Sequence, residues 1–295
     1  MPPIPVSDAV PTGKPEWAFL SGAWVRPDEL TISADDIGFR QAVIAVERMR
    51  TYDGRLFEVD AHLDRWQQTS AALLLGDLPD KETLKSLFAE LLQRNSDWVS
   101  RQGDVGLTMF ATPGVASENR STLAVHLQSL DHDRIHLHHS LGQPVVITPV
   151  VQPPPESWSR QIKVRCRLHY YLADQFAKAS DVNAIGLLLD ADGSVTETSV
   201  CNVAVVREGS ILSPVDSQIL GGVTQAFIER IAARLAITWE KGVITPEMLS
   251  LADEVLLMGT DTGLWFANSI NGAMIADGTA GPVCRRLQDA FAAAR

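Results

Sequence analysis

The sequence predicts an α+β fold in two domains, and three observations lead to this expectation. The 295 residues suffice for about two domains that each bury a core. In the first part, strand patterns at 17–25, 42–50 and 123–130 alternate with helical patterns at 61–75 and 81–94, which is typical of a small α+β domain. A polar, histidine-rich stretch then precedes a second, larger run of strands and helices.

The domain boundaries follow from shifts in composition. We expect, in order, a proline-rich flexible leader (1–15), a small α+β domain (16–130), a solvated interdomain linker (131–143) and a larger domain (144–295). The linker holds His136, His138 and His139, for which a metal site is the alternative. These histidines lack accompanying Cys or carboxylate spacing, so a linker is favoured and no metal is expected.

Composition argues against several classes of partner. The chain has 25 basic and 36 acidic residues, and the net charge of -11 disfavours binding to nucleic acid or to anionic membranes. Its apolar runs are too short to cross a bilayer, and the leader lacks the pattern of a secretion signal. Three cysteines form an odd and sparse set, as in a reducing compartment. We therefore expect a cytoplasmic protein.

Lys163 lies in QIKVRCRLHYYLADQFAKA, where strand-like alternation changes to helical spacing. Lys163 and Arg165 share one strand face, and the helical pattern starts at Leu168, so Lys163 is expected near a strand-to-helix transition. Neighbouring cations disfavour the protonated amine, which lowers its pKa and supplies a neutral nucleophile. Taken alone, a lysine is more often a solvated surface charge.

Glu197 lies on the returning strand of a predicted hairpin. In GLLLDADGSVTETSVCNVAVV, the Asp192-Gly193 pair supplies the turn between two apolar runs. The strand holds the Glu197 carboxylate at a fixed position on one face of the sheet. Two interpretations remain open: an exposed strand carboxylate, or a group that keeps a pyridine nitrogen protonated.

Two glycine-containing turns could receive an anion. The glycine pair of ILGGVT precedes a helix, where unpaired amides and the Thr224 hydroxyl favour a phosphate. Gly259 ends an apolar strand and is followed by Thr260, although Asp261 would repel an anion unless its side chain turns away. An ordinary helix cap and an ordinary turn are the alternatives.

Together, these segments resemble the fold-type IV pyridoxal-phosphate enzymes, which include branched-chain aminotransferase, D-amino acid aminotransferase and aminodeoxychorismate lyase. The resemblance covers most of the chain after the leader and rests on motifs in the family's order: DIGF, AHLDRW, IK, TETSVCN, LGGVT, MGT and DGTAGPV. It implies pyridoxal 5'-phosphate as cofactor and a β-barrel-like larger domain with flanking helices that binds it, as in D-amino acid aminotransferase. It also implies a homodimer, for which Trp17, Trp24 and Trp265 could supply apolar surface, although core burial explains them equally well.

The resemblance also implies roles for individual residues. Lys163 would form the Schiff base with the cofactor and move the proton, and Glu197 would contact the pyridine nitrogen. The other cofactor-binding residues that it implies are Arg65, Leu220, Gly222, Val223, Thr224, Gly259 and Thr260, of which Arg65, Val223, Thr224 and Thr260 would hold the phosphate. For Arg65, a helix with a buried face would hold the guanidinium, whereas a surface charge is the alternative.

Two positions depart from the family pattern. Val46, in AVIAVE, replaces an aromatic residue that commonly lines the substrate pocket. Pro113 stands where D-amino acid aminotransferases carry an Arg for the substrate carboxylate. Arg50 and Arg167 are candidates to replace that Arg, although we expect an exposed structural role for each.

The expected function is that of a pyridoxal-phosphate-dependent aminotransferase. Its substrates would be a small amino acid or amine and a 2-oxo acid. Two alternatives remain: a lyase similar to aminodeoxychorismate lyase, and a degenerate, non-catalytic family member.

Overall fold

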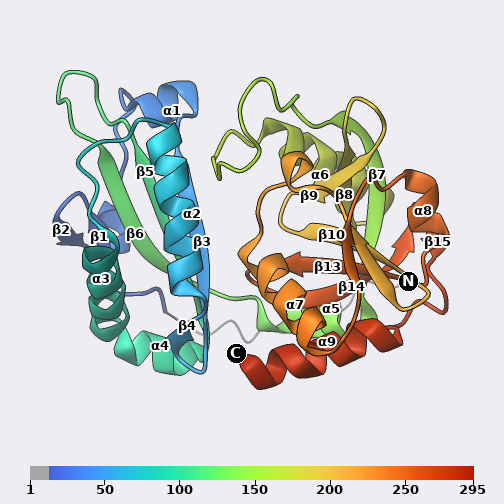
Figure 1. Ribbon diagram of the computed structural model, residues 1–295. Coiled ribbons are helices and arrows are strands. Elements are labelled where there is room, and N and C mark those ends of the chain that lie inside the picture. Colours follow the sequence, from blue (N-terminus) through green and yellow to red (C-terminus); the bar gives the residue numbers. More distant parts are fainter. Residues whose placement is uncertain (1–12) are drawn as a thin grey trace.

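The computed structural model describes residues 13–295, and most of the predicted leader, residues 1–15, lies outside them (Figure 1). The chain forms two sheets that lie side by side. The elements of the small domain are β1 (Ala18–Leu20), β2 (Ala23–Val25), α1 (Ile37–Gln41), β3 (Ala45–Tyr52), β4 (Arg55–Leu56), α2 (Val59–Ala72), α3 (Lys81–Arg94), α4 (Ser96–Gln102), β5 (Val105–Thr112) and β6 (Thr122–Ser129).

The small domain is a six-stranded sheet in the order β2-β1-β6-β5-β3-β4. Helices α2, α3 and α4 cover one face, where Leu63, Trp66 and Phe88 pack against inward-facing residues such as Met49 and Leu107. Both predicted helices are confirmed, and α3 has the predicted bounds. The predicted strand at 17–25 is instead a hairpin, β1 and β2, with a turn between them.

The predicted linker, residues 131–143, contains a helix, α5 (His132–Leu141). The His138 ring stacks on Trp265 with centroids 5.9 Å apart, and His139 Nε2 lies 2.7 Å from the carbonyl oxygen of Thr262. The segment is therefore docked on the second sheet at these two points. Within residues 13–295, no helix is both long and apolar enough to span a bilayer.

The large domain contains a closed ring of strands. Its elements are β7 (Gln143–Val151), α6 (Leu168–Ser180), β8 (Ile185–Leu189), β9 (Val195–Thr198), β10 (Asn202–Arg207), β11 (Ser210–Ser213), α7 (Val223–Arg234), β12 (Trp239–Lys241), α8 (Pro246–Ser250), β13 (Glu254–Gly259), β14 (Gly263–Ile270), β15 (Ala273–Met274) and α9 (Pro282–Ala294). The path β10-β13-β14-β7-β8-β9 closes where Glu197 of β9 pairs with Asn202 of β10. The predicted barrel-like architecture is confirmed.

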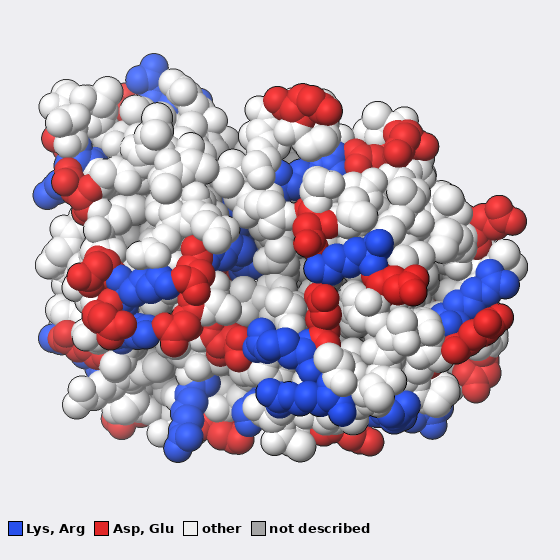
Figure 2. Space-filling view, viewed as in Figure 1, with Lys and Arg blue, Asp and Glu red and all other residues white. Residues whose placement is uncertain are grey.

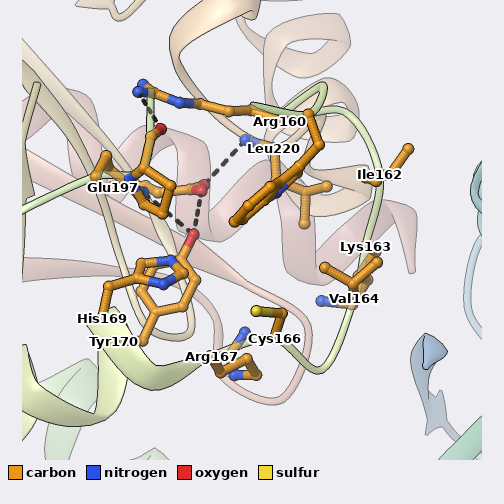
Figure 3. Close-up of a pocket in the computed structure, with 13 residues that line it drawn as sticks. Arg160, Ile162, Lys163, Val164, Cys166, Arg167, His169, Tyr170, Glu197 and Leu220 are labelled. Carbon is orange, nitrogen blue, oxygen red and sulfur yellow. Dashed lines mark hydrogen bonds between the residues drawn. The ribbon is translucent and has the colours of Figure 1, made fainter. Parts of the chain in front are cut away.

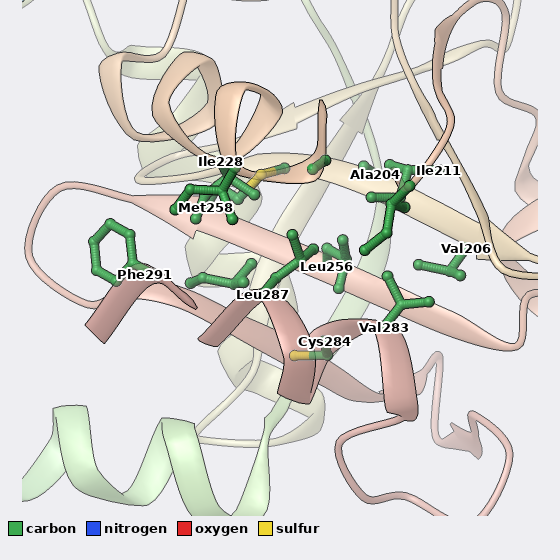
Figure 4. Packing of buried hydrophobic residues seen from close by; sticks show 14 of the residues in the cluster. Ala204, Val206, Ile211, Ile228, Leu256, Met258, Val283, Cys284, Leu287 and Phe291 are labelled. Atoms are coloured by element: carbon green, nitrogen blue, oxygen red, sulfur yellow. The ribbon is translucent and has the colours of Figure 1, made fainter. Parts of the chain in front are cut away.

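Period-two alternation divides the barrel strands between two cores. On β10, Val203 and Val205 face an inner cluster that includes Trp265, while Ala204 and Val206 face outward. Helices α7 and α9 pack on this outer side, where Figure 4 shows residues of both helices against β10 and β13. The start of α7 is therefore anchored by a large apolar cluster, and it lies at the site described next.

Candidate active site

Lys163 lies on the loop between β7 and α6, and the small domain fixes its backbone. Its amide donates to Thr69 Oγ1 (3.0 Å), and its carbonyl oxygen accepts from the Val46 amide (3.0 Å). The predicted strand is reduced to one isolated bridge between Val164 and Ala45, but α6 does begin soon afterwards, at Leu168. The loop thus presents the Lys163 amine at the junction of the two domains.

The environment of Lys163 favours the neutral amine. Burial, followed by the charge of Arg65, lowers the pKa of Lys163 from 10.5 to about 8, although Glu47 and Glu197 act in the opposite direction. The predicted lowering is confirmed, but its main cause is desolvation rather than neighbouring cations. A larger fraction of the amine is therefore deprotonated near neutral pH than for an ordinary lysine.

Glu197 is buried on β9 and turned toward the same space. Its Oε1 accepts from the Tyr170 hydroxyl (2.7 Å), and its Oε2 accepts from the Leu220 amide (3.1 Å) (Figure 3). Its Oε2 also accepts from Asn202 Nδ2 (3.2 Å). Burial raises the pKa of Glu197, while hydrogen bonds from Tyr170 and Leu220 oppose this rise. The interpretation of Glu197 as an exposed carboxylate is therefore wrong. Its hydrogen-bond partners Tyr170 and Asn202 were not predicted from the sequence.

Arg65 is buried on α2 as part of an ionic network. Its Nε and Nη2 donate to Glu47 Oε2 (3.1 Å) and Oε1 (2.6 Å), and its Nη1 donates to the Gly221 carbonyl (2.9 Å). His62 Nδ1 lies 2.9 Å from Glu47 Oε1. Although burial favours the neutral acid, Arg65 and His62 hold the pKa of Glu47 well below its usual range. The surface-charge interpretation of Arg65 is therefore wrong.

The start of α7 leaves backbone donors available. The first intrahelical acceptor is the Gly222 carbonyl, which receives the Ala226 amide, so the amides of Val223 and Thr224 have no helical partner. A Cβ on Gly222 would lie 1.9 Å from Asn202 Oδ1, so a larger residue here would displace the Asn202 side chain or the helix start. The helix start thus offers positive potential and free N–H groups at a tightly packed entrance.

The structure brings all the predicted site residues to one pocket. Its empty volume is about 460 Å³, including the open mouth. Its lining includes Lys163, Arg65, Glu197, Leu220, Gly222, Val223, Thr224, Gly259 and Thr260. An adjoining pocket of about 470 Å³ shares Lys163, Arg167, Tyr170, Glu197 and Leu220 with it. Figure 2 shows basic atoms recessed in the hollow between the two halves of the molecule.

Comparison with known proteins identifies the family. The amino-transferase class IV model matches residues 45–270. The chain belongs to the class IV aminotransferases. Proteins named D-alanine aminotransferase, from Staphylococcus aureus (strain N315) and Staphylococcus haemolyticus, are each 29% identical to it, and the alignments cover 94% and 92% of this chain and 96% and 95% of theirs.

Solved structures of branched-chain aminotransferases share the fold. Branched-chain amino acid aminotransferase from Escherichia coli superposes with a TM-score of 0.88 at 19% identity, over 95% of this chain and 94% of that one. A thermophilic archaeal enzyme, branched-chain aminotransferase from Thermoproteus uzoniensis with norvaline, gives 0.84 at 20% identity and the same coverage. Another branched-chain amino acid aminotransferase, solved with pyridoxamine 5'-phosphate, gives 0.85 at 24% identity, again with this coverage. The architecture of a class IV aminotransferase is thus retained at low sequence identity.

The structure places the two residues that depart from the family pattern and the two arginines that were candidates to bind the substrate carboxylate. Within the described chain, neither Val46 nor Pro113 lines either pocket. Arg50 is buried rather than exposed, since its guanidinium stacks on Tyr52 and donates to backbone carbonyls. Arg167 is half-buried and lines both pockets, so its predicted exposed role is also wrong.

Asp261, which would repel an anion, is turned toward another partner. Its Oδ1 and Oδ2 accept from Arg48 Nε (2.8 Å) and Nη2 (3.1 Å). Because Arg48 lies on β3 and Asp261 follows β13, this pair also joins the two domains. The carboxylate that follows the Gly259-Thr260 turn is therefore compensated in this class IV aminotransferase.

Proposed function

We propose that this class IV aminotransferase binds pyridoxal 5'-phosphate in the pocket and transfers an amino group from a small amino acid or amine to a 2-oxo acid. The observation that carries the proposal is the combination of three groups in one pocket. These are an amine of lowered pKa at Lys163, a buried carboxylate at Glu197 and a cluster of hydrogen-bond donors for an anion at the start of α7. When bound, the cofactor supplies an electron sink for proton removal from the carbon that bears the amino group.

The donor set suits the phosphate of this cofactor. Arg65 keeps N–H groups beyond those that it gives to Glu47 and Gly221, because a guanidinium has five. The free amides of Val223 and Thr224 and the hydroxyls of Thr224 and Thr260 complete the set. The list of proposed phosphate ligands is therefore Arg65, Val223, Thr224 and Thr260.

Lys163 and Glu197 have different tasks in this proposal. Lys163 Nζ would hold the cofactor and would move the proton at the substrate carbon that bears the amino group. Glu197, oriented by Tyr170, Asn202 and the Leu220 amide, favours a protonated ring nitrogen. The low pKa of Lys163 suits it to accept a proton near neutral pH.

Borohydride reduction followed by peptide mapping tests the attachment. The protein incubated with pyridoxal 5'-phosphate is expected to carry the reduced adduct on Lys163, and Lys163→Ala should lose it. An adduct found on Lys178 or Lys241 instead would reject the assignment. Transfer of nitrogen from D- or L-alanine to a 2-oxo acid then separates an aminotransferase from a lyase, because a lyase releases product without forming a new amino acid.

We further propose that the enzyme is a homodimer. The three tryptophans give no support. Trp265 lies in the barrel core, Trp24 packs beside the core of the small domain, and the half-buried Trp17 ring lies under the Arg26 and Arg94 guanidinium groups. Helix α6 does give support, since Leu168, Tyr171 and Phe176, at helical spacing, are 69%, 61% and 46% exposed. Such an apolar stripe beside the active-site loop is unusual on a monomer.

Sedimentation equilibrium tests the homodimer. A dimer is expected at micromolar concentration, and Leu168→Lys should weaken it through charge repulsion and lost apolar burial. Gln93→Lys, at an exposed position on α3 of the small domain and not on α6, serves as the control. A wild-type monomer that still transaminates would reject the dimer proposal. A cytoplasmic location remains a prediction from the sequence.

A further inference from the structure

We propose that Arg167, together with the hydroxyl group of Ser199, binds the substrate carboxylate; this inference rests on the proposed function. It narrows the substrate from an amino acid or amine to a compound that carries a carboxylate. Arg167 lies four residues after Lys163 and lines both pockets beside it.

The first observation is the uncompensated charge of Arg167. Its Nη2 donates to the Ser199 carbonyl oxygen, and its guanidinium lies over the Tyr170 ring, 4.6 Å from the centroid. Within residues 13–295, no carboxylate lies within ion-pair distance of it. A guanidinium has five N–H donors in a planar arrangement that matches a carboxylate, and only one of them has a hydrogen-bond acceptor here.

The second observation is the Ser199 hydroxyl, which is independent of the first. Ser199 is only 8% exposed, and its Oγ has no hydrogen-bond partner among the described residues. A buried hydroxyl without a partner destabilises the folded protein, so such groups usually await a ligand or water. Ser199 lines the same pocket as Arg167, and its own carbonyl oxygen fixes the guanidinium.

The other arginines that line the pockets, Arg65 and Arg160, are already paired, and so is Arg48 nearby. Arg65 is bound to Glu47, Arg48 to Asp261 and Arg160 to Asp190. Arg50, the other candidate to bind the carboxylate, faces Asp104 and the backbone. Arg167 is the one arginine lining the pockets that keeps its charge free among the described residues. It lies on the same loop as Lys163, and both residues line the two pockets.

Binding of propionate to the cofactor-loaded enzyme tests this role without turnover. Propionate affinity is measured by the change in the visible absorption of the bound cofactor. Arg167→Met is expected to weaken it on the order of 10- to 100-fold, as for loss of a charged hydrogen bond, and Ser199→Ala several-fold. Arg165→Met is the matched control, because Arg165 lies on the same loop, is exposed and lines neither pocket.

The borohydride adduct and the propionate affinities together separate the possible failures. If the borohydride adduct is absent from wild-type Lys163, the proposed function fails and this inference with it. If the adduct forms but Arg167→Met keeps wild-type propionate affinity, only the carboxylate assignment is overturned. Should Arg167→Met fail to fold, Arg167→Lys and Ser199→Ala decide, and unchanged affinity in both overturns the assignment. Absence of any propionate binding to the wild-type enzyme also overturns it.

Discussion

Replacing Lys163 by Met is expected to stabilise the cofactor-free protein. The fall of the Lys163 pKa from 10.5 to about 8 measures the cost of holding its charged form in the folded state. At about 1.4 kcal/mol per pH unit, this difference corresponds to roughly 3 kcal/mol below pH 8. Methionine keeps the apolar stem without the ammonium group, so most of this cost is removed.

Because the pKa of Lys163 is lowered in the folded state, the stability gain of Lys163→Met depends on pH in a defined direction. The folded pKa is depressed, so between about pH 8 and 10.5 the unfolded chain binds more protons than the folded one. The contribution of Lys163 to wild-type stability therefore rises with pH over this window. The advantage of Lys163→Met is full below pH 8 and disappears by pH 10.5.

Urea unfolding of the cofactor-free protein at pH 7 and at pH 10 measures this difference. Lys178→Met is the control, because Lys178 is exposed on α6 and should change stability little at either pH. A gain for Lys163→Met of the same size at both pH values, or no gain at pH 7, would refute the reasoning from burial.

Three more substitutions test the architecture of the site. Glu47→Gln should destabilise the protein by about 3 to 5 kcal/mol in urea unfolding, because Arg65 remains buried without its counter-ion, and a loss below about 1 kcal/mol would contradict this. Arg65→Ala should weaken cofactor binding by about 1.5 to 3 kcal/mol in a spectroscopic titration, so an unchanged affinity would sink the phosphate placement. Gly222→Ala should lower cofactor affinity by displacing Asn202 or the helix start, whereas Gly76→Ala, where a Cβ meets nothing within 4 Å, should leave it unchanged.

Local sequence patterns predicted those elements whose stability is largely local. Helix α3 repeats its apolar residues at helical spacing and begins at an Asp80 side chain that accepts the Thr83 amide, so both of its ends were predictable. Helix α5 was not predicted, because its histidines give no apolar face. His138 and His139 instead dock on β14 and the turn before it, which are distant in sequence.

In the candidate site too, local patterns predicted some residues, whereas residues that depend on partners distant in sequence were missed. Motifs in family order predicted the residues that line the pocket, but not the second layer that orients them. Glu47 was missed because its partner Arg65 comes from another element, 18 residues away. A signal was present, since period-two spacing places Glu47 between Ala45 and Met49 on the inward face of β3. An acidic residue on such a face predicts a buried cation nearby.

The same strand explains how the two domains form one site. Alternation along β3 turns Glu47 toward Arg65 and Arg48 toward Asp261, while the Val46 amide holds the Lys163 carbonyl. Three consecutive residues of the small domain thus contact Arg65, the turn after β13 and the lysine loop. Because a shift of β3 would move all three contacts together, cofactor binding and the docking of the two domains are expected to be coupled rather than independent.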